Sequence, residues 1–588
     1  ELSGIWRDCV VLRRGLAMVG GHAFWDVPPV YQEEGGRLIG LDGEVSFRHP
    51  PGPRTESEAG FSFRGGELFL ESPAVGNLAV MDPDALHLVC DWTGSVPLYY
   101  AETGGGILFS SHLRPLRRAL GADADPAGMR GFLEDGFNIG SRTPFRGIRR
   151  LLGGQSLRFT LERGLQVHEH SRAWTPGGDG LRSRSEVAEA AREALLGTFR
   201  ALPTLHGPTG LMMSPGWDSR TLLAAILKDR DPESVLCYGH GDLASRELRL
   251  AQEICSFREM PWHAEPLTEG LYRVDDLETA FVRTESVVFP HWHRAGGFLA
   301  GRGSPCVMAG VFGEMLGGRY WLAHATSGVS KGLTLFRELL RRGPGPEAPT
   351  AEAAERVKGL FRKRGEGRPW YLAQDAPPGS PETLDILNAD MEGSVDRFVA
   401  RGSVTGNQLA EAFQGEHIGG RYCNAQLMSC RASGDVSLPL ANRQLLDIVT
   451  RAPIHLRLQN GLNQRIIQAL DPALLSFPTA ATLLPARMPI PLQEVSRILR
   501  KGGQTAQWSL HFGSRGRIPM PRLSWPNYEF LRNGRALNRI LEDLRSEVWD
   551  HRALQSRVTE IQKGEWRREL LPFSTFIMKV LTVDMMLR

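Results

Sequence analysis

The chain has 588 residues, and its 69 Lys and Arg nearly balance 66 Asp and Glu, which gives a formal net charge of +3. One hydrophobic core stops growing near roughly 250–300 residues, so this length predicts two or three domains. The basic residues are scattered, which argues against nucleic acid as the main partner. No run approaches the roughly 20 apolar residues of a membrane span, and the first residues lack a secretion signal, so we expect no membrane contact.

Cysteine usage predicts the compartment. The seven cysteines form no CxxC pair, and most have apolar neighbours in the sequence. An odd number of such cysteines predicts reduced, buried thiols, so we expect a cytoplasmic protein.

The order of predicted elements indicates an α/β chain with a different, α+β domain in front. Residues 1–174 contain short strands separated by turns, which predicts a β-sandwich-like first domain. A polar, glycine-rich linker follows at Thr175–Ser185. Residues 186–588 begin with repeated strand-then-helix units, which predicts a parallel sheet with helices on both faces. We expect an exposed insertion at about 344–378 and a mainly helical remainder, with one amphipathic helix at Ala536–Leu554.

The most informative segment is LMMSPGWDSR, Leu211–Arg220, in which an apolar strand leads into small residues before a helix. Small residues let backbone N–H groups approach an anion, and a helix N-terminus favours negative charge, so the segment predicts a phosphate site. The predicted nucleotide contacts are Ser214, Gly216, Trp217, Asp218 and Ser219. The alternative is an ordinary strand-to-helix turn in which Asp218 and Ser219 cap the helix.

Several segments together carry a resemblance to a known family. The run SPGWDS resembles the SGGxDS loop of ATP-pyrophosphatases, and its surroundings resemble the asparagine synthetase family over nearly the whole chain. The further segments, in the family's order, are Ser3-Gly4-Ile5, Asp42-Gly43-Glu44, DWTGSVPLYY (91–100), RTPFRGIRRLLGG (142–154), SRELRLAQEI with Glu247 and Ala251, GEMLGGRY (313–320) and SLPLANRQLLDIV (437–449).

The resemblance implies a fold and a set of site residues. It implies a first domain of the N-terminal-nucleophile glutaminase type and a second, ATP-pyrophosphatase domain that binds ATP and Mg²⁺. Asp218 would hold the metal, because Mg²⁺ prefers carboxylate and phosphate oxygens. The family's second metal carboxylate falls on Gly313 or, with a turn one residue shorter, on Glu314, and we prefer Glu314 because it keeps a carboxylate there. His240, after the second strand, is a predicted nucleotide contact or a plain loop residue.

Two further residues are predicted to take part in catalysis. Asp435 matches the family's glutamate before its PFLD segment, a position for a general base. Arg487 is the nearest positional match to the family's late lysine, since no lysine occurs between Lys363 and Lys501. A guanidinium can balance charge but cannot act as a base, so the predicted role of Arg487 is electrostatic.

The chain departs from the family where the glutaminase nucleophile should be. The family's first residue is a cysteine whose free α-amine activates its thiol, whereas the matching residue here is Ser3, with two residues before it. We therefore expect no use of glutamine and a first domain that serves as a scaffold. Cys9 is expected to be an inert thiol in a strand. Pro215 replaces a glycine of the loop and removes one N–H donor.

One other pair invites a metal interpretation. His291 and His293 lie in FPHWHRA, but no third ligand with zinc spacing accompanies them, so packing around Trp292 or a place in a substrate pocket is the preferred interpretation.

The sequence therefore predicts a ligase that adenylates a carboxylate and couples it to an amine. Loss of the glutaminase nucleophile favours an amine within the substrate itself, as the resemblance implies for lasso-peptide macrolactam cyclases and β-lactam synthetases. The partner would be a small molecule or a precursor peptide, delivered with a protease or a leader-binding protein. The alternatives are an asparagine synthetase or related ligase that uses free ammonia, and a non-catalytic nucleotide-binding descendant.

Overall fold

The structure is a computed structural model. It describes residues 75–82, 84–169, 183–201, 207–320, 350–363, 368–403, 405–514, 517–518, 522–563 and 570–588, together with the backbone of four strands within residues 9–43.

The first domain is built from antiparallel sheets, as the alternation of short strands and turns predicts. A six-stranded sheet has the order β11-β10-β6-β5-β4-β3, a three-stranded sheet has the order β8-β7-β9, and β1 pairs with β2. The strands are β1 (Cys9–Arg14), β2 (Leu16–Gly21), β3 (Tyr31–Glu34), β4 (Arg37–Gly43), β5 (Gly76–Met81), β6 (Leu86–Cys90), β7 (Tyr99–Thr103), β8 (Gly106–Ser110), β9 (Arg149–Arg150), β10 (Gln155–Thr160) and β11 (Gly164–Glu169). A core cluster that includes Leu88, Tyr100 and Leu157 joins the six-stranded and three-stranded sheets, which makes the domain sandwich-like.

Two helices of the first domain lie between β8 and β9 in the chain, α2 (Leu113–Leu120) and α3 (Pro126–Asp135), and α3 packs against helices of the second domain. The side chain of Asp125 accepts a hydrogen bond from the Gly128 N–H, and Pro126 occupies the first helical position, so α3 begins with two favourable residues.

The second domain contains the predicted parallel sheet, with the order β14-β13-β12-β15-β16. All four neighbouring pairs of strands are parallel. The strands are β12 (Thr209–Met212), β13 (Val235–His240), β14 (Trp262–Glu265), β15 (Cys306–Met308) and β16 (Asp435–Ser437). The helices between them are α4 (Arg184–Ala201), α5 (Trp217–Ile226), α6 (Arg246–Phe257), α7 (Val274–Thr284), α8 (Pro290–Gly301), α9 (Gly313–Leu316), α11 (Thr350–Phe361), α12 (Pro381–Ala400), α13 (Gly406–Gln414), the π-helix η6 (Gly415–Cys423) and α14 (Asn424–Met428), with α4 before β12.

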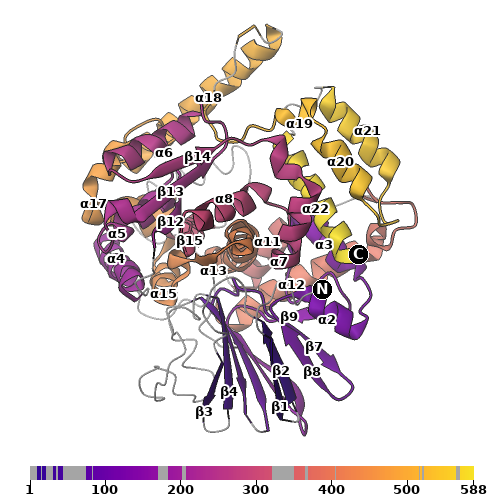
Figure 1. The fold of residues 1–588 in the computed structure, drawn as a ribbon. Helices are drawn as coiled ribbons and strands as arrows, with labels where there is room; N and C mark the ends of the chain where they lie inside the picture. The colour runs from indigo at the N-terminus through magenta and orange to yellow at the C-terminus, as the bar shows by residue number, and fades with distance from the viewer. Residues whose placement is uncertain are drawn as a thin grey trace.

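The remainder of the chain is mainly helical, as predicted. Its helices are α15 (Arg443–Arg451), α16 (Ile454–Arg457), α17 (Gly461–Leu470), α18 (Ile490–Gly513), α19 (Phe530–Asn533), α20 (Ala536–Asp543), α21 (His551–Gln562) and α22 (Leu570–Leu587). In Figure 1, α12, α13 and α15 lie between the parallel sheet and the first domain, whereas α18 projects away from the body.

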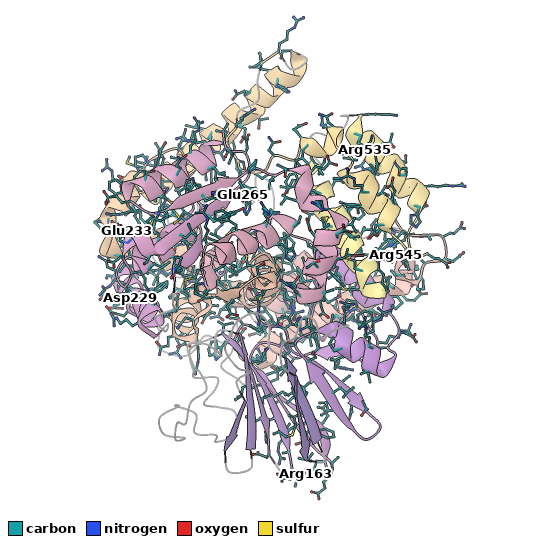
Figure 2. All side chains as sticks on the ribbon, in the orientation of Figure 1. Arg163, Asp229, Glu233, Glu265, Arg535 and Arg545 are labelled. Atoms are coloured by element: carbon teal, nitrogen blue, oxygen red, sulfur yellow. The ribbon has the colours of Figure 1, made fainter. Side chains whose placement is uncertain are left out.

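The two domains share hydrophobic cores instead of meeting at a polar interface. One cluster combines Val80 and Trp92 of the first domain with Leu211 and Phe312 of the second. Another combines Leu116 and Phe132 with residues of α20, α21 and α22. Because apolar surface is buried across both boundaries, the first domain and the second are expected to fold and melt together. In Figure 2, Arg163 marks the tip of the β10–β11 hairpin at the bottom of the view, and Glu265 marks the end of β14 within the second domain.

Two predictions about elements are wrong in detail. The segment 344–378 is not simply an exposed insertion, because α11 packs on α12 and α13 with Val357 fully buried, and Leu372 is also in the core. The charged residues of α11 lie on one face of the helix and its apolar residues on the other. The flanking Pro and Gly hid this apolar periodicity in the sequence. The segment Ala536–Leu554 is two helices, since Asp550 caps a new one at His551.

One described helix, α22, is apolar and long enough to cross a membrane, but 72% of it is buried inside the protein. It contains the buried polar residues Lys579 and Asp584. The carboxylate of Asp584 accepts hydrogen bonds from the Trp549 indole and from the backbone N–H groups of Arg545 and Ser546. Those contacts make α22 a core helix of this fold.

Candidate active site

The predicted phosphate loop lies where the order of strands in the parallel sheet reverses. Strand β12 is flanked by β13 on one side and by β15 on the other. The chain runs from β12 to β13 and β14 on one side of β12 and then crosses to β15 on the other side. In open α/β sheets, ligands bind beyond the carboxyl ends of the strands at such a point. The chain passes from Met212 through Ser214 and Gly216 into α5 at this position.

The loop is closed by its own small side chains. The Ser214 and Ser219 hydroxyls lie 3.0 Å apart, and the Gly216 N–H donates to the Ser214 hydroxyl over 3.2 Å. Gly216 is the N-cap of α5, so no side chain caps the helix. Asp218 and Ser219 lie inside the first turn, which does not fit the alternative in which they are the caps. The start of α5 therefore faces the switch point with its positive end uncovered by a side-chain cap.

A buried arginine that the sequence analysis did not single out fixes this loop. The guanidinium of Arg220 donates to the carbonyl oxygens of Pro215, Leu474, Phe477 and Pro478. Burial without a carboxylate partner lowers the pKa of Arg220 to about 9. This side chain ties the loop to the segment that follows α17, which fixes the position of the loop in the fold.

Asp218 and Glu314 are brought together by the turn after β15. The Gly313 backbone presses on Asp218 so closely that a Cβ at Gly313 would lie 2.1 Å from the Asp218 Cγ and 2.4 Å from its Oδ1. An aspartate could not occupy position 313 without displacing Asp218. Glu314, the next residue, interacts electrostatically with the Asp218 carboxylate. Of the two positions considered from the sequence, the structure thus leaves room for a second carboxylate at Glu314.

The positive charge near Asp218 and Glu314 does not balance the negative charge of these two carboxylates. Burial and the nearby Glu314 raise the pKa of Asp218 to about 8, and burial raises the pKa of Glu314. Asn463 donates to the Asp218 Oδ1 over 3.2 Å, and Arg319 supplies a more distant positive charge. The Glu314 Oε2 is buried and accepts no hydrogen bond. Two desolvated carboxylates with an unpartnered oxygen are suited to a divalent cation.

The kind of metal that fits follows from the ligand count. Among the described residues, no group of three or more His, Cys, Asp or Glu could form a closed metal site. Mg²⁺ is typically bound by one or two carboxylates and completes its octahedron with phosphate oxygens and water. Asp218 and Glu314 match that requirement and do not match a structural zinc site.

His240 ends β13, next to β12, where a nucleotide contact was predicted. Its ring lies 4.5 Å from the His291 ring and 5.1 Å from the Trp525 ring, measured between centroids. Burial lowers the pKa of His240 to about 3, and its Nδ1 has no hydrogen-bond partner. His240 is therefore neutral at pH 7. Its contact with a nucleotide remains a prediction.

His291 and His293 lie at the start of α8 and do not point to one metal. His291 packs on His240, while the His293 Nε2 lies 3.0 Å from the Ser286 carbonyl oxygen. The ring of His291 is packed among aromatic rings, as expected, but the rings it meets are those of His240, Phe289 and Trp525, and a place in a substrate pocket remains a prediction.

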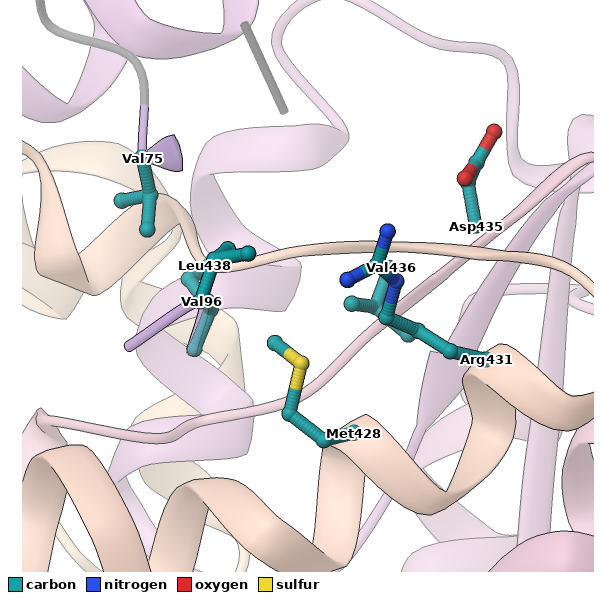
Figure 3. A pocket seen from close by; sticks show the side chains of 7 residues that line it. All are labelled: Val75, Val96, Met428, Arg431, Asp435, Val436 and Leu438. Carbon is teal, nitrogen blue, oxygen red and sulfur yellow. The ribbon is translucent and has the colours of Figure 1, made fainter. Parts of the chain in front are cut away.

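Asp435 is not brought to the carboxylate pair. It is the first residue of β16 and pairs with Cys306, the first residue of β15, whereas Asp218 and Glu314 follow the carboxyl ends of their strands. Asp435 lines a small cavity of about 10 Å³, enough for about one water molecule, together with Arg431 and Val96 (Figure 3). A general-base role at the metal site would need substrate that extends past the edge of the sheet.

Arg487 lies in the loop between α17 and α18, and its side chain is exposed. Its backbone N–H donates to the Leu475 carbonyl over 2.9 Å, which bonds it directly to the segment that Arg220 ties to the phosphate loop. The loop that carries Arg487 is thus connected to the phosphate loop. An electrostatic role for the Arg487 side chain remains a prediction.

The first domain uses its family-like signature for structure. The Asp91 carboxylate accepts hydrogen bonds from Gly76 N, Gly94 N and the backbone and hydroxyl of Thr93. Burial raises the pKa of Asp91 to about 6. Ser3 lies outside the described residues, and so does the side chain of Cys9, although its predicted strand is present as β1.

The sequence analysis missed Asn463, Arg220 and Arg319. Asn463 reaches Asp218 from α17, and it also accepts a hydrogen bond from Thr221 over 3.1 Å. No local pattern marks an asparagine in GLNQR as part of a site that is more than 240 positions away. Arg220 directly follows the loop motif and could have been found by asking what supports the loop.

Comparisons with known proteins add little to this site. No family model matches the chain, and no curated protein matches it. Among solved structures, glutamine phosphoribosylpyrophosphate amidotransferase from B. subtilis, complexed with ADP and GMP, is 10% identical, with a TM-score of 0.16. The match covers 42% of this chain and 50% of that one. Similarity at this level carries no argument about fold or activity.

Proposed function

We propose that this protein is an ATP-dependent ligase that adenylates a carboxylate and couples it to an amine. The observation that carries the proposal is the pair Asp218 and Glu314, two desolvated carboxylates with an unpartnered oxygen beside a small-residue loop at the switch point of a parallel sheet. A metal–pyrophosphate group would complete the coordination that these residues lack.

The residues would divide the first step between them. The loop from Ser214 to Ser219 and the N-terminus of α5 would hold the phosphates of ATP. Mg²⁺ would supply charge stabilisation for the departing pyrophosphate. The substrate carboxylate oxygen attacks the α-phosphorus, the bond to the β-phosphate bridging oxygen breaks, and an acyl-adenylate forms as pyrophosphate leaves.

In the second step the amine nitrogen attacks the acyl carbon and AMP leaves with the bonding electrons, while the amine loses one proton. Asp435 is the predicted base, but it lies at the amino-terminal ends of the strands of the parallel sheet. The proton of the amine would then reach Asp435 through substrate or water, unless the substrate extends from one end of the strands to the other. Arg487 would neutralise charge on the adenylate.

The absence of a glutaminase nucleophile at Ser3 favours an amine that belongs to the substrate. We therefore propose an intramolecular amide, such as a macrolactam in a peptide. Free ammonia as the amine is the alternative within the same chemistry.

The test uses peptides encoded beside this gene. The protein is incubated with ATP, Mg²⁺ and each peptide, and pyrophosphate release and peptide mass are recorded. A macrolactam loses the mass of one water, whereas ammonia capture replaces a hydroxyl by an amino group. Glutamine should add nothing, and Ser3→Ala should behave as wild type. If nucleotide binds without exchange of pyrophosphate into ATP for any peptide, the chain is a non-catalytic nucleotide-binding protein.

A further inference from the structure

The turn that carries Glu314 is held in an unfavourable backbone conformation. Phe312, two residues before Glu314, has φ 71° and ψ 0°, and its side chain is fully buried. A bulky residue in the left-handed region is strained and persists only where its surroundings impose it. The question is therefore which residues hold Phe312, since they also decide where Glu314 lies.

The Phe312 ring is held by two adjacent glycines of η6. A Cβ at Gly419 would lie 3.2 Å from the Phe312 Cε1 and 3.4 Å from the Tyr320 Cε2. A Cβ at Gly420 would lie 3.6 Å from the Phe312 Cζ and 3.0 Å from the Thr93 carbonyl oxygen of the first domain. These glycines form a notch between the turn and the first domain. The Gln414 amide adds a second hold, because it donates to the Tyr320 carbonyl over 2.6 Å.

The helix that provides this notch is itself unusual. Nine residues of π-helix, Gly415–Cys423, lie between α13 and α14. π-helical turns are rare, are normally a single turn, and are frequently found at functional sites. A wider helix changes which residues face a given side, so the notch depends on the π-helical register being maintained.

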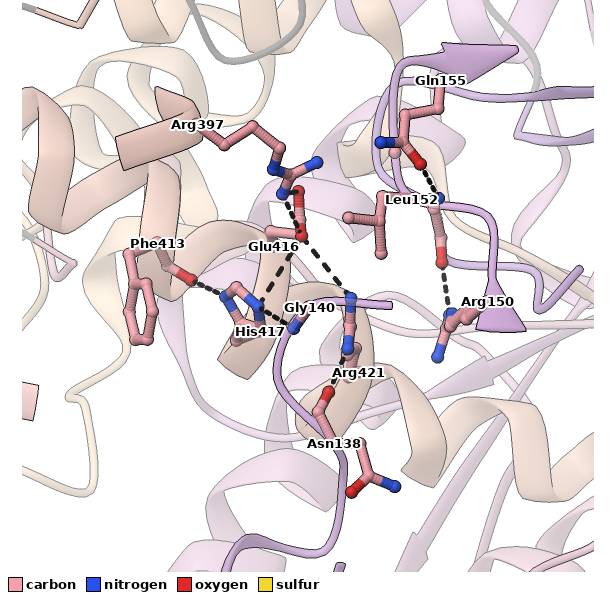
Figure 4. A network of polar contacts seen from close by, with 12 residues as sticks. Asn138, Gly140, Arg150, Leu152, Gln155, Arg397, Phe413, Glu416, His417 and Arg421 are labelled. Carbon is pink, nitrogen blue, oxygen red and sulfur yellow. Dashed lines mark hydrogen bonds and ion pairs between the residues drawn. The ribbon is translucent and has the colours of Figure 1, made fainter. Parts of the chain in front are cut away.

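Buried polar contacts with the first domain maintain that register (Figure 4). The Gly140 N–H donates to the His417 Nε2 over 3.3 Å, and the His417 Nδ1 lies 2.8 Å from the Phe413 carbonyl. This pattern requires a neutral ring with its proton on Nδ1, in agreement with burial lowering the pKa of His417 to about 3. Arg421 donates to the Asn138 carbonyl.

A carboxylate inside the π-helix connects these contacts. Glu416 is 1% exposed, and Arg397 donates to its Oε1 over 2.5 Å. Arg421 lies 3.5 Å from the same oxygen. Beyond η6, the Asn424 amide donates to the Ser95 carbonyl over 2.7 Å. First-domain loops at 93–95 and 138–140 thus contact His417, Gly420 and Arg421 of η6 and Asn424 just after it.

We propose that η6 positions Glu314 against Asp218 through the Phe312–Gly419 contact, and that the first domain serves to hold η6 in this register. Gly419, Gly420 and His417 are positioning residues in this proposal, because they touch neither metal nor substrate. The inference rests on the proposed function, since it takes Asp218 and Glu314 as metal ligands. It gives the first domain a role that requires no glutaminase chemistry.

The test measures binding of Mn²⁺ alone by electron paramagnetic resonance, in the full chain and without ATP. Gly419→Ala places a Cβ against the Phe312 ring and should weaken Mn²⁺ binding about 10-fold, as typical for residues that orient metal ligands. Gly420→Ala, which meets the first-domain backbone, should weaken it in the same direction. Gly393→Ala is the matched control, because Gly393 is exposed in α12 with nothing within 4 Å of an added Cβ. It should bind Mn²⁺ as wild type.

A second measurement needs no variant and covers the case in which Gly419→Ala does not fold. In wild type, Mn²⁺ should slow hydrogen exchange at the amides of 419–423, because ligand binding at the turn stabilises the notch. Unchanged exchange there, or wild-type affinity in a folded Gly419→Ala protein, would overturn the inference. Those results leave the proposed function intact if Asp218→Asn abolishes Mn²⁺ binding. Equal Mn²⁺ binding by wild type and Asp218→Asn would instead remove the metal site itself.

Discussion

Two carboxylate centres in this protein have opposite electrostatic environments. At Asp218, burial and a second carboxylate raise the pKa to about 8. At Glu416, burial alone would raise the pKa, but Arg397, together with Arg421 and Arg401, lowers it to about 2. One centre lacks positive charge, and the other is surrounded by it.

The difference distinguishes the proposed cation site at Asp218 from the structural carboxylate at Glu416. A buried carboxylate that is fully paired stabilises a particular arrangement, whereas removal of one partner leaves an uncompensated charge. A buried pair of carboxylates without a cation costs stability and persists where a function requires it. Glu416 thus connects domains, and Asp218 with Glu314 is the place where the protein would accept a cation.

The largest effect should come from Asp218→Asn. The substitution keeps size but removes the metal carboxylate, so several kcal/mol of transition-state stabilisation should be lost and pyrophosphate release should nearly stop. Steady-state assays with circular dichroism as the check on folding measure this. Turnover at the wild-type rate would remove Asp218 from the mechanism.

At the other centre, Glu416→Gln should affect stability more than chemistry. Loss of this charge leaves Arg397 and Arg421 partly unpaired in the interior, which should cost about 3 kcal/mol or more. The apparent melting temperature should fall, and one transition should remain because the domains share their cores. A melting temperature equal to that of wild type would mean that the arginines, and not Glu416, maintain this network.

A smaller effect is expected for Glu314→Gln. The charge of the pair falls by one unit while size and hydrogen bonding are kept, so Mg²⁺ should bind less tightly and the protein should remain folded. Activity should fall sharply and recover in part at high Mg²⁺. The Mg²⁺ titration of pyrophosphate release decides this, and curves that coincide with those of wild type would leave Asp218 as the only protein carboxylate on the metal.

The smallest effect is the dependence of stability on pH, and its sign differs between the centres. The folded pKa of Asp218 lies above its unfolded value of 3.8, so the folded state retains a proton that the unfolded state loses. Without metal, this contribution to stability should therefore be lost as the pH rises from about 4 to about 8. The folded pKa of Glu416 lies below its unfolded value of 4.5, so its contribution is present above pH 4.5 and lost toward pH 2.

Melting temperatures at pH 5 and pH 8, with EDTA or with Mg²⁺, measure the first of these trends. The decrease toward pH 8 should be smaller with Mg²⁺ and smaller in Asp218→Asn. A decrease of the same size in both proteins would assign it to other groups.

Most of the elements and the loop could be predicted from the amino-acid sequence alone. Alternation of apolar and polar residues predicted the β-rich first domain, and strand-then-helix units predicted the parallel sheet, because these periods reflect which faces are buried. The segment Leu211–Arg220 was found because strand, small residues and helix are adjacent in the chain. Nearby Asp218 could therefore be singled out without coordinates.

The surroundings of these residues could not be predicted from the sequence, because they depend on the folded structure. The choice of Glu314 over Gly313 depends on the space that Asp218 occupies, which no local pattern records. Asn463, the π-helical notch and the arginines around Glu416 come from segments that are distant in sequence. Asp435 matched a motif, yet the strand register places it at the amino-terminal ends of the strands, opposite the ends that Asp218 and Glu314 follow. Periodicity and motifs encode local conformation and burial, whereas the environment of a charge depends on which segments pack together.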